Sequence, residues 1–141
     1  MIVHDIYLKR ADWNVRVYIS VSTYHADEIL DDLIYLGCRG ENLTRAKESL
    51  WSGHLNTGLT YTNTDKRETL IVIAKASDGA EYWNSLDHEK QHLLQDIAST
   101  EDINPFGEEI SYISGEFIRD VYKIAKPLLC DCCRKKIRRM L

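Results

Sequence analysis

In the stretch SLDHEKQHLLQDI, residues 85–97, the apolar residues recur at the spacing that places them on one face of a helix. On a helical wheel, one side of this region carries the apolar residues Tyr82, Trp83, Leu86, Leu93, Leu94 and Ile97. The other side carries Ser85, His88, His92 and Ser99. We therefore predict an amphipathic helix over residues 80–98 that buries its apolar side in the core and leaves both histidines outside it.

Two pairs of strand-like segments come earlier in the chain. Residues 2–8 (IVHDIYL) and 13–21 (WNVRVYISV) are rich in β-branched and aromatic residues and are separated by a short polar turn. Residues 59–63 (LTYTN) and 69–75 (TLIVIAK) flank the polar segment TDKRE, and the second of them is apolar enough to be buried. Each pair predicts a β-hairpin, and together they predict an antiparallel or mixed sheet.

The remaining segments predict helices. Residues 25–37 and 41–53 are amphipathic, and each ends on a glycine that suits a C-terminal cap. A break at residues 99–107 is followed by a last helix, 108–126, which Pro127 ends. The predicted fold class is therefore α+β, with an antiparallel or mixed sheet packed on helices.

The composition indicates an ordinary globular protein. The chain has 141 residues, of which 28% are charged and 44% hydrophobic, and domains commonly run to about 100–150 residues. We therefore expect a single domain over residues 1–141. The net charge of -4 gives no electrostatic reason to expect nucleic acid as a partner.

The compartment is predicted from the N-terminus and the apolar runs. Asp5, Lys9 and Arg10 interrupt any apolar run at the start, which argues against a secretory signal. Apolar runs such as LIVIA at 70–74 are far shorter than the ~20 residues of a membrane-spanning helix. We therefore expect a cytoplasmic protein.

Residues 128–141 form a basic, cysteine-containing C-terminal tail. Its cysteines, Cys130, Cys132 and Cys133, could join Cys38 in a structural zinc site. C-x-C-C is not the usual C-x-x-C knuckle, however, so reduced thiols are the favoured interpretation. The basic end RKKIRRML is interpreted as solvated rather than as a contact to nucleic acid or a membrane.

His88 and His92 are four positions apart on the predicted helix, and Glu89 directly follows the first of them. Residues at i and i+4 lie one turn apart on the same face, so two imidazoles can bind one ion while the glutamate acts on a bound water. This is the chemistry of the HExxH motif, and Zn²⁺ is the expected ion. The alternative is a solvated helix face that carries two histidines by chance.

A catalytic zinc site normally takes three protein ligands and leaves the fourth position to water. The segment GEEISYISGEF, residues 107–117, offers Glu108, followed three residues later by Ser111. Together with HExxH, this second motif resembles the gluzincins, the thermolysin-like branch of zinc peptidases, over residues 86–115. The resemblance implies a zincin-like fold in which the HExxH helix and the C-terminal helix form the site. The implied metal ligands are His88, His92 and Glu108, with Glu109 as the alternative to Glu108.

The helical faces favour Glu108 over Glu109 as the third ligand. Glu108 lines up with Tyr112 and Gly115, whereas Glu109 shares its face with charged residues. Gly115 would allow the two helices to approach each other closely. Tyr112, one turn beyond Glu108, is the candidate donor to the oxyanion that forms during hydrolysis.

The surroundings of the metal ligands depart from the gluzincin pattern. Tyr112 stands where that family has an Asp that orients a metal-binding His. Metal-binding histidines usually donate their second ring N–H to a carboxylate or a carbonyl. In this chain Asp87, Asp96 or a backbone oxygen would have to accept the hydrogen bond from that second ring N–H.

The predicted function is that of a zinc-dependent metallopeptidase, which hydrolyses peptide bonds with a zinc-activated water. Glu89 would accept the proton of that water. The peptide or protein substrate could pair as an added strand with residues 69–75, and the alternative is that this strand is internal to the sheet. The alternative is a non-catalytic metal-binding or protein-interaction module on the same fold, such as a host or phage regulatory protein. The alternative is kept beside the peptidase because the small chain leaves little for the subdomain that usually walls a peptidase cleft.

Overall fold

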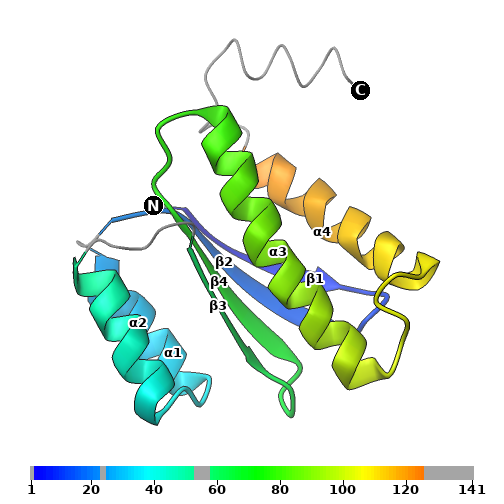
Figure 1. The fold of residues 1–141 in the computed structure, drawn as a ribbon, viewed down its shortest axis with the longest axis horizontal. Helices are drawn as coiled ribbons and strands as arrows, with labels where there is room; N and C mark the ends of the chain where they lie inside the picture. Colours follow the sequence, from blue (N-terminus) through cyan, green and yellow to red (C-terminus); the bar gives the residue numbers. More distant parts are fainter. Residues whose placement is uncertain (1, 23–24, 53–57, 126–141) are drawn as a thin grey trace.

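The structure, a computed structural model, describes residues 2–22, 25–52 and 58–125. Its elements follow the predicted order along the chain (Figure 1). The strands are β1 (Ile2–Leu8), β2 (Trp13–Val21), β3 (Gly58–Asn63) and β4 (Glu68–Ala74). The helices are α1 (Ala26–Tyr35), α2 (Gly40–Ser52), α3 (Gly79–Glu101) and α4 (Glu108–Ala125). The predicted α+β class is confirmed.

The described strands form a mixed sheet in the order β1-β2-β4-β3. β1 with β2, and β3 with β4, pair antiparallel as the two predicted hairpins require, whereas β2 and β4 run parallel. β4 is almost entirely apolar because it has a strand on each side and helices over both faces. The strand predicted at residues 69–75 is therefore internal, which was the alternative to its pairing with a substrate strand. The edge strand on this side of the sheet is β3.

Helices cover both faces of the sheet, with α1 and α2 on one face and α3 and α4 on the other (Figure 1). Successive residues of β4 point to opposite faces. Leu70 and Val72 therefore pack in one core cluster with α1 and α2, and Ile71 and Ile73 pack in a second cluster with α3 and α4. The sheet is the middle layer of three.

α3 and α4 divide their face of the sheet between them. α3 contacts β3 and β4, whereas α4 contacts β1 and one flank of α3. α4 is also tied to the turn between β1 and β2. There the backbone N–H of Lys9 donates to Glu116 (2.7 Å), and the Arg10 guanidinium lies 3.4 Å from the Glu109 carboxylate. One side of α3 therefore faces α4, and the opposite side faces the edge strand β3.

Gly37 ends α1, as the sequence predicts. It has a φ of +99°, and the following N–H, of Cys38, donates to the Leu33 carbonyl (2.9 Å), a bond that belongs to the Schellman motif. The side-chain amide of Asn63, at the end of β3, donates to the Leu36 carbonyl (2.8 Å). This bond joins the end of α1 to the edge strand.

Some predictions fall outside the described residues. They concern the cap at Gly53 and the tail 128–141, with Cys130, Cys132 and Cys133. Cys38 is described as a free thiol that is 2% exposed, and burial raises its pKa. Within the described ranges, no helix is both long and apolar enough to cross a membrane.

Candidate metal centre

The register of α3 is set at its capped N-terminus. The Asp78 carboxylate accepts the backbone N–H of Glu81 (2.7 Å), and the Glu81 carboxylate accepts the N–H of Ser77 (3.0 Å). From this start, the helix buries Tyr82, Ser85, Leu86, Glu89, Leu93, Leu94, Ile97 and Ala98. His88 and His92 are exposed, as predicted. Ser85, which the wheel places on their polar side, is instead buried.

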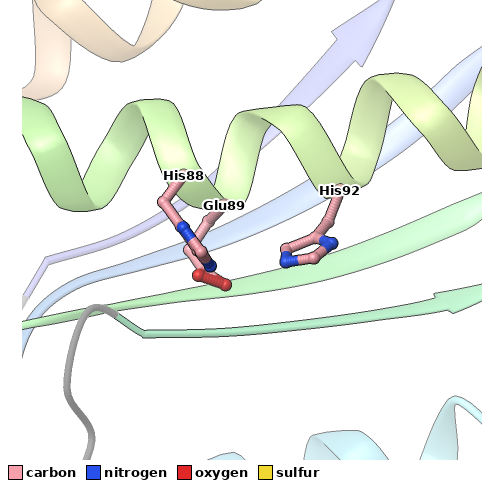
Figure 2. Close-up of side chains that lie close together, drawn as sticks. All are labelled: His88, Glu89 and His92. Atoms are coloured by element: carbon pink, nitrogen blue, oxygen red, sulfur yellow. The ribbon is translucent and has the colours of Figure 1, made fainter.

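His88, Glu89 and His92 converge on one point beside α3 (Figure 2). The atoms through which they could bind an ion, one per side chain, all lie within 4.8 Å of one another. The two imidazole rings have centroids 5.1 Å apart and an interplanar angle of 75°. The predicted HExxH arrangement is therefore present on a helix, and its side chains point the same way.

This set of donors fits a divalent metal ion. Zinc binds histidine nitrogen at about 2.0–2.1 Å, so two ligand atoms of a tetrahedral site lie about 3.4 Å apart. The ligand atoms of the three side chains lie within 4.8 Å of one another, and both histidines are exposed. Imidazole and carboxylate together suit zinc and other first-row divalent ions. The geometry shows a group able to hold a metal ion, without selecting the metal.

Glu89 differs from the two histidines because it is buried, with 3% of its surface exposed. A buried carboxylate needs hydrogen-bond donors to offset its loss of hydration. The hydroxyl of Thr60, on β3, donates to Glu89 Oε1 (3.2 Å) and lies 3.4 Å from the Glu89 backbone carbonyl. The edge strand therefore holds the carboxylate beside the histidines.

Gly58 allows this close approach between α3 and β3. A Cβ at that position would overlap the Val72 carbonyl oxygen and would lie 3.1 Å from Cγ of Glu89. Any larger residue would push β3 away from the helix or displace the Glu89 side chain. The absence of a side chain at Gly58 is therefore needed for β3 to lie against Glu89.

The group opens into a cleft between α3 and the edge strand. The cleft has a volume of about 420 Å³ and is lined by Gly58, Leu59, Thr60, His88, Glu89, His92 and Asp96. A second cavity, of about 410 Å³, adjoins it on the α2 side of β3 and shares Leu59, Thr60 and Asp96. The histidines therefore face open space along β3 rather than the packed core.

Glu108, Glu109 and Tyr112 lie away from this cleft. All three belong to the first turns of α4, which packs over β1 on the flank of α3 opposite β3. Arg10 contacts this part of α4, since its guanidinium pairs with Glu109 and lies 4.6 Å from the Tyr112 ring centroid. Tyr112 is 51% exposed. Among the described residues, the metal-binding group therefore contains His88, Glu89 and His92 but neither Glu108 nor the predicted oxyanion donor.

Gly115 does not mediate close contact between α3 and α4, contrary to the expectation from the sequence. Within 4 Å, a Cβ at this position would meet only the guanidinium of Arg119, one turn further along the same helix. The buried stripe of α4 consists of Ile110, Ile113, Phe117, Val121 and Ala125. The face with Glu108, Tyr112 and Gly115 is not this stripe, so it does not pack against the HExxH helix.

Of the two carboxylates considered as partners of the histidines, Asp96 lines the cleft and Asp87 does not. Asp87 pairs with Lys90 (2.9 Å) and is 64% exposed. Asp96 Oδ2 accepts a hydrogen bond from the Thr62 hydroxyl (2.7 Å). Sequence reasoning missed both threonines of β3, Thr60 and Thr62. Their alternation along one strand was the available signal, because alternate strand residues face the same helix.

In comparisons with known proteins, no protein-family model, no curated protein and no solved structure matches this chain. The functional assignment therefore rests on the sequence and the geometry of the site. What these establish is a helix-borne His-Glu-His group, compatible with a zincin motif, beside an edge strand.

Proposed function

We propose that this protein is a zinc-dependent metallopeptidase that hydrolyses a bond of an extended peptide or protein. The observation that carries the proposal is the convergence of His88, Glu89 and His92 on a cleft beside the edge strand β3. This combination supplies ligands for a metal ion, a carboxylate that can act on water, and a strand edge that can hold a peptide.

His88 and His92 are the proposed metal ligands, and Glu89 is the proposed general base. A zinc ion held there would lower the pKa of its water and would polarise the substrate carbonyl. Glu89 would accept the proton of the attacking water. Its carboxylate is suited to this role because Thr60 holds it by a hydrogen bond and the surrounding burial keeps bulk water away.

The substrate is proposed to pair with β3, which replaces the central strand β4 as the binding edge. An edge strand presents unpaired backbone N–H and C=O groups, and an extended peptide can add to them as a further strand. Gly58, Leu59 and Thr60 line the cleft at the level of the histidines. A peptide bonded along β3 would therefore pass the metal-binding group.

The third metal ligand implied by the sequence, Glu108, would need a rearrangement of α4. Its first turn would have to cross from the β1 side of α3 to the β3 side, and the ion pair between Arg10 and Glu109 would break. The proposal therefore rests on the two histidines and Glu89. Waters or substrate would complete the coordination.

The second candidate is a non-catalytic metal-binding or protein-interaction module. One observation favours it: the ligand atom of Glu89 already lies within 4.8 Å of those of both histidines, so Glu89 could itself be the third ligand. A site closed in this way would hold the ion for structural reasons. The edge of β3 would then recognise a partner without cleaving it.

Substitution of Glu89 separates the two candidates. Elemental analysis of protein purified without added metal should find about one zinc per chain, and His88→Ala with His92→Ala should remove it. For a general base, Glu89→Gln should retain the zinc and lose hydrolysis of a peptide library by a factor of ~100 or more. Loss of zinc from Glu89→Gln would instead favour the structural site. Full zinc content in the double histidine variant would show that the metal binds elsewhere, and would contradict both the peptidase and a structural metal site at the histidines.

A further inference from the structure

A chain of hydrogen bonds crosses the sheet and ends on Asp96. The indole Nε1 of Trp13 lies 2.9 Å from the Thr69 hydroxyl, which lies 2.8 Å from the Thr62 hydroxyl. Thr62 in turn lies 2.7 Å from Asp96 Oδ2. These residues come from β2, β4, β3 and α3 respectively. The chain therefore connects the interior of the sheet to the cleft that contains the histidines.

Each hydrogen bond in this series has one donor and one acceptor assignment that leaves every group satisfied. An indole N–H can only donate, so Thr69 accepts from Trp13. An ionised carboxylate can only accept, so Thr62 donates its hydroxyl hydrogen to Asp96. Thr69 must then donate to Thr62, because Thr62 has only one hydrogen to give. Each hydrogen bond in the series is therefore donated in the direction of Asp96.

The chain is rigid because its inner members are buried and paired. Trp13 is 0% and Thr69 is 2% exposed, and Thr62 is the register partner of Thr69 in the β3–β4 ladder. Buried groups of this kind retain their hydrogen bonds, since an unpaired one costs about 1–3 kcal/mol. Asp96 Oδ2 is thus held at a fixed place relative to the sheet.

Asp96 follows His92 by one helical turn and lines the same cleft. It is unsuited to be a metal ligand itself. Three ligands at positions 88, 92 and 96 would span ~12 Å along the helix, too far for one ion. Residues at i and i+4 are neighbours on one helix face, so Asp96 lies one turn from the exposed ring of His92, although the structure contains no hydrogen bond or ion pair between these two residues.

We propose that Asp96 is a positioning residue that accepts the non-ligating ring N–H of His92, and that the Trp13–Thr69–Thr62 chain holds it in place. The inference rests on the proposed function, because it assigns a role toward the same metal site. Such a bond selects one tautomer of His92 and orients the ring toward the ion.

The first test measures zinc affinity by competition with a chromophoric chelator. Asp96→Asn retains an acceptor for Thr62 but loses the carboxylate, and it should weaken zinc binding by about 10–100-fold. Thr62→Val should weaken it in the same direction, because Asp96 loses its anchor, whereas Thr62→Ser should restore wild-type affinity. Asp87→Asn is the matched control, since it removes a carboxylate from the same helix next to His88, and it should have no effect.

The second test uses metal-free protein, which separates positioning from a purely structural role. Nitrogen NMR of the imidazole rings should find His92 mainly as one tautomer in the wild type and as a mixture in Asp96→Asn, while His88 stays unchanged. Wild-type zinc affinity and an unchanged His92 tautomer in Asp96→Asn would overturn the inference. An equal loss of affinity in Asp87→Asn would also overturn it, because the cause would then be overall charge. If the wild-type protein binds no zinc, the proposed function itself fails, a result distinct from either of these.

Discussion

Cγ of Glu89 lies 3.1 Å from the position that a Cβ on Gly58 would occupy. The HExxH helix and the edge strand therefore meet at a glycine, and the Val72 carbonyl oxygen and the Cγ methylene of Glu89 lie where a side chain at this position would be. This contact makes β3 part of the site. It also explains why Glu89 is buried while the histidines on either side of it in the motif are exposed.

Substitution of Gly58 should damage both the fold and the site. We expect Gly58→Ala to lower the free energy of unfolding by about 1–3 kcal/mol, because the added methyl overlaps the Val72 carbonyl and crowds Glu89. Urea denaturation would measure the change. Gly115→Ala is the control, since a Cβ there meets only a flexible arginine, and alanine should stabilise that helix by up to about 1 kcal/mol. Equal effects at the two positions would show that β3 is not packed as described.

Removal of the Thr60 hydroxyl should reduce hydrolysis while zinc binding is retained. Thr60→Val leaves Glu89 without the hydroxyl donor to its Oε1, and hydrogen bonds to charged groups contribute about 1.5–3 kcal/mol. We therefore expect kcat/KM for peptide cleavage to fall roughly tenfold or more. Thr60→Ser, which retains the hydroxyl, should behave like the wild type. A Thr60→Val enzyme with full activity would mean that Glu89 does not depend on this bond.

Glu108→Gln and Glu109→Gln should both leave zinc affinity unchanged. In the described arrangement, neither carboxylate belongs to the group around His88 and His92, and Glu109 faces Arg10 instead. Chelator competition would compare the two variants with the wild type. A selective loss of affinity in Glu108→Gln would show that α4 moves to the β3 side of α3 when metal binds, as the gluzincin resemblance implies.

Tyr82→Phe should stabilise the protein. Tyr82 is 6% exposed, and its hydroxyl is a buried side-chain atom without a hydrogen-bond partner among the described residues. A buried unsatisfied hydroxyl costs about 1–3 kcal/mol, so we expect the free energy of unfolding to rise by about 1 kcal/mol on removing it. Urea denaturation at neutral pH would test this, and a clear loss of stability would reveal a partner for the hydroxyl.

The same residue predicts a dependence on alkaline pH. Burial raises the pKa of Tyr82 above its ordinary value, so the folded protein binds this proton more tightly than the unfolded chain does. The contribution of Tyr82 to stability is therefore fully present below about pH 10, the pKa of an unfolded tyrosine, and is lost as the pH rises further. Tyr82→Phe should lose less stability than the wild type above that pH, measured by denaturation at a series of pH values.

The sequence by itself determined the features that depend on local spacing. Alternation within residues 2–8 and 13–21 identified the first hairpin, and a glycine after an amphipathic segment identified the end of α1 at Gly37. Helical periodicity placed His88 and His92 on one face, because residues at i and i+4 of any helix lie together whatever the helix packs against. These predictions needed no knowledge of the partner elements.

Only the tertiary structure decided which strand is the edge and what lies on each side of α3. Two hairpins can join in several orders, and the parallel pairing of β2 with β4, which places β3 outside, forms between segments far apart in the chain. The buried stripe of α4 then packs over β1, on the flank of α3 away from the histidines. The local match at Glu108 carried no information about that choice. The burial of apolar surface over the whole sheet decides which flank of a helix its neighbour occupies. Here it placed Gly58, Thr60 and Thr62 of β3, and not Glu108 of α4, beside the HExxH group.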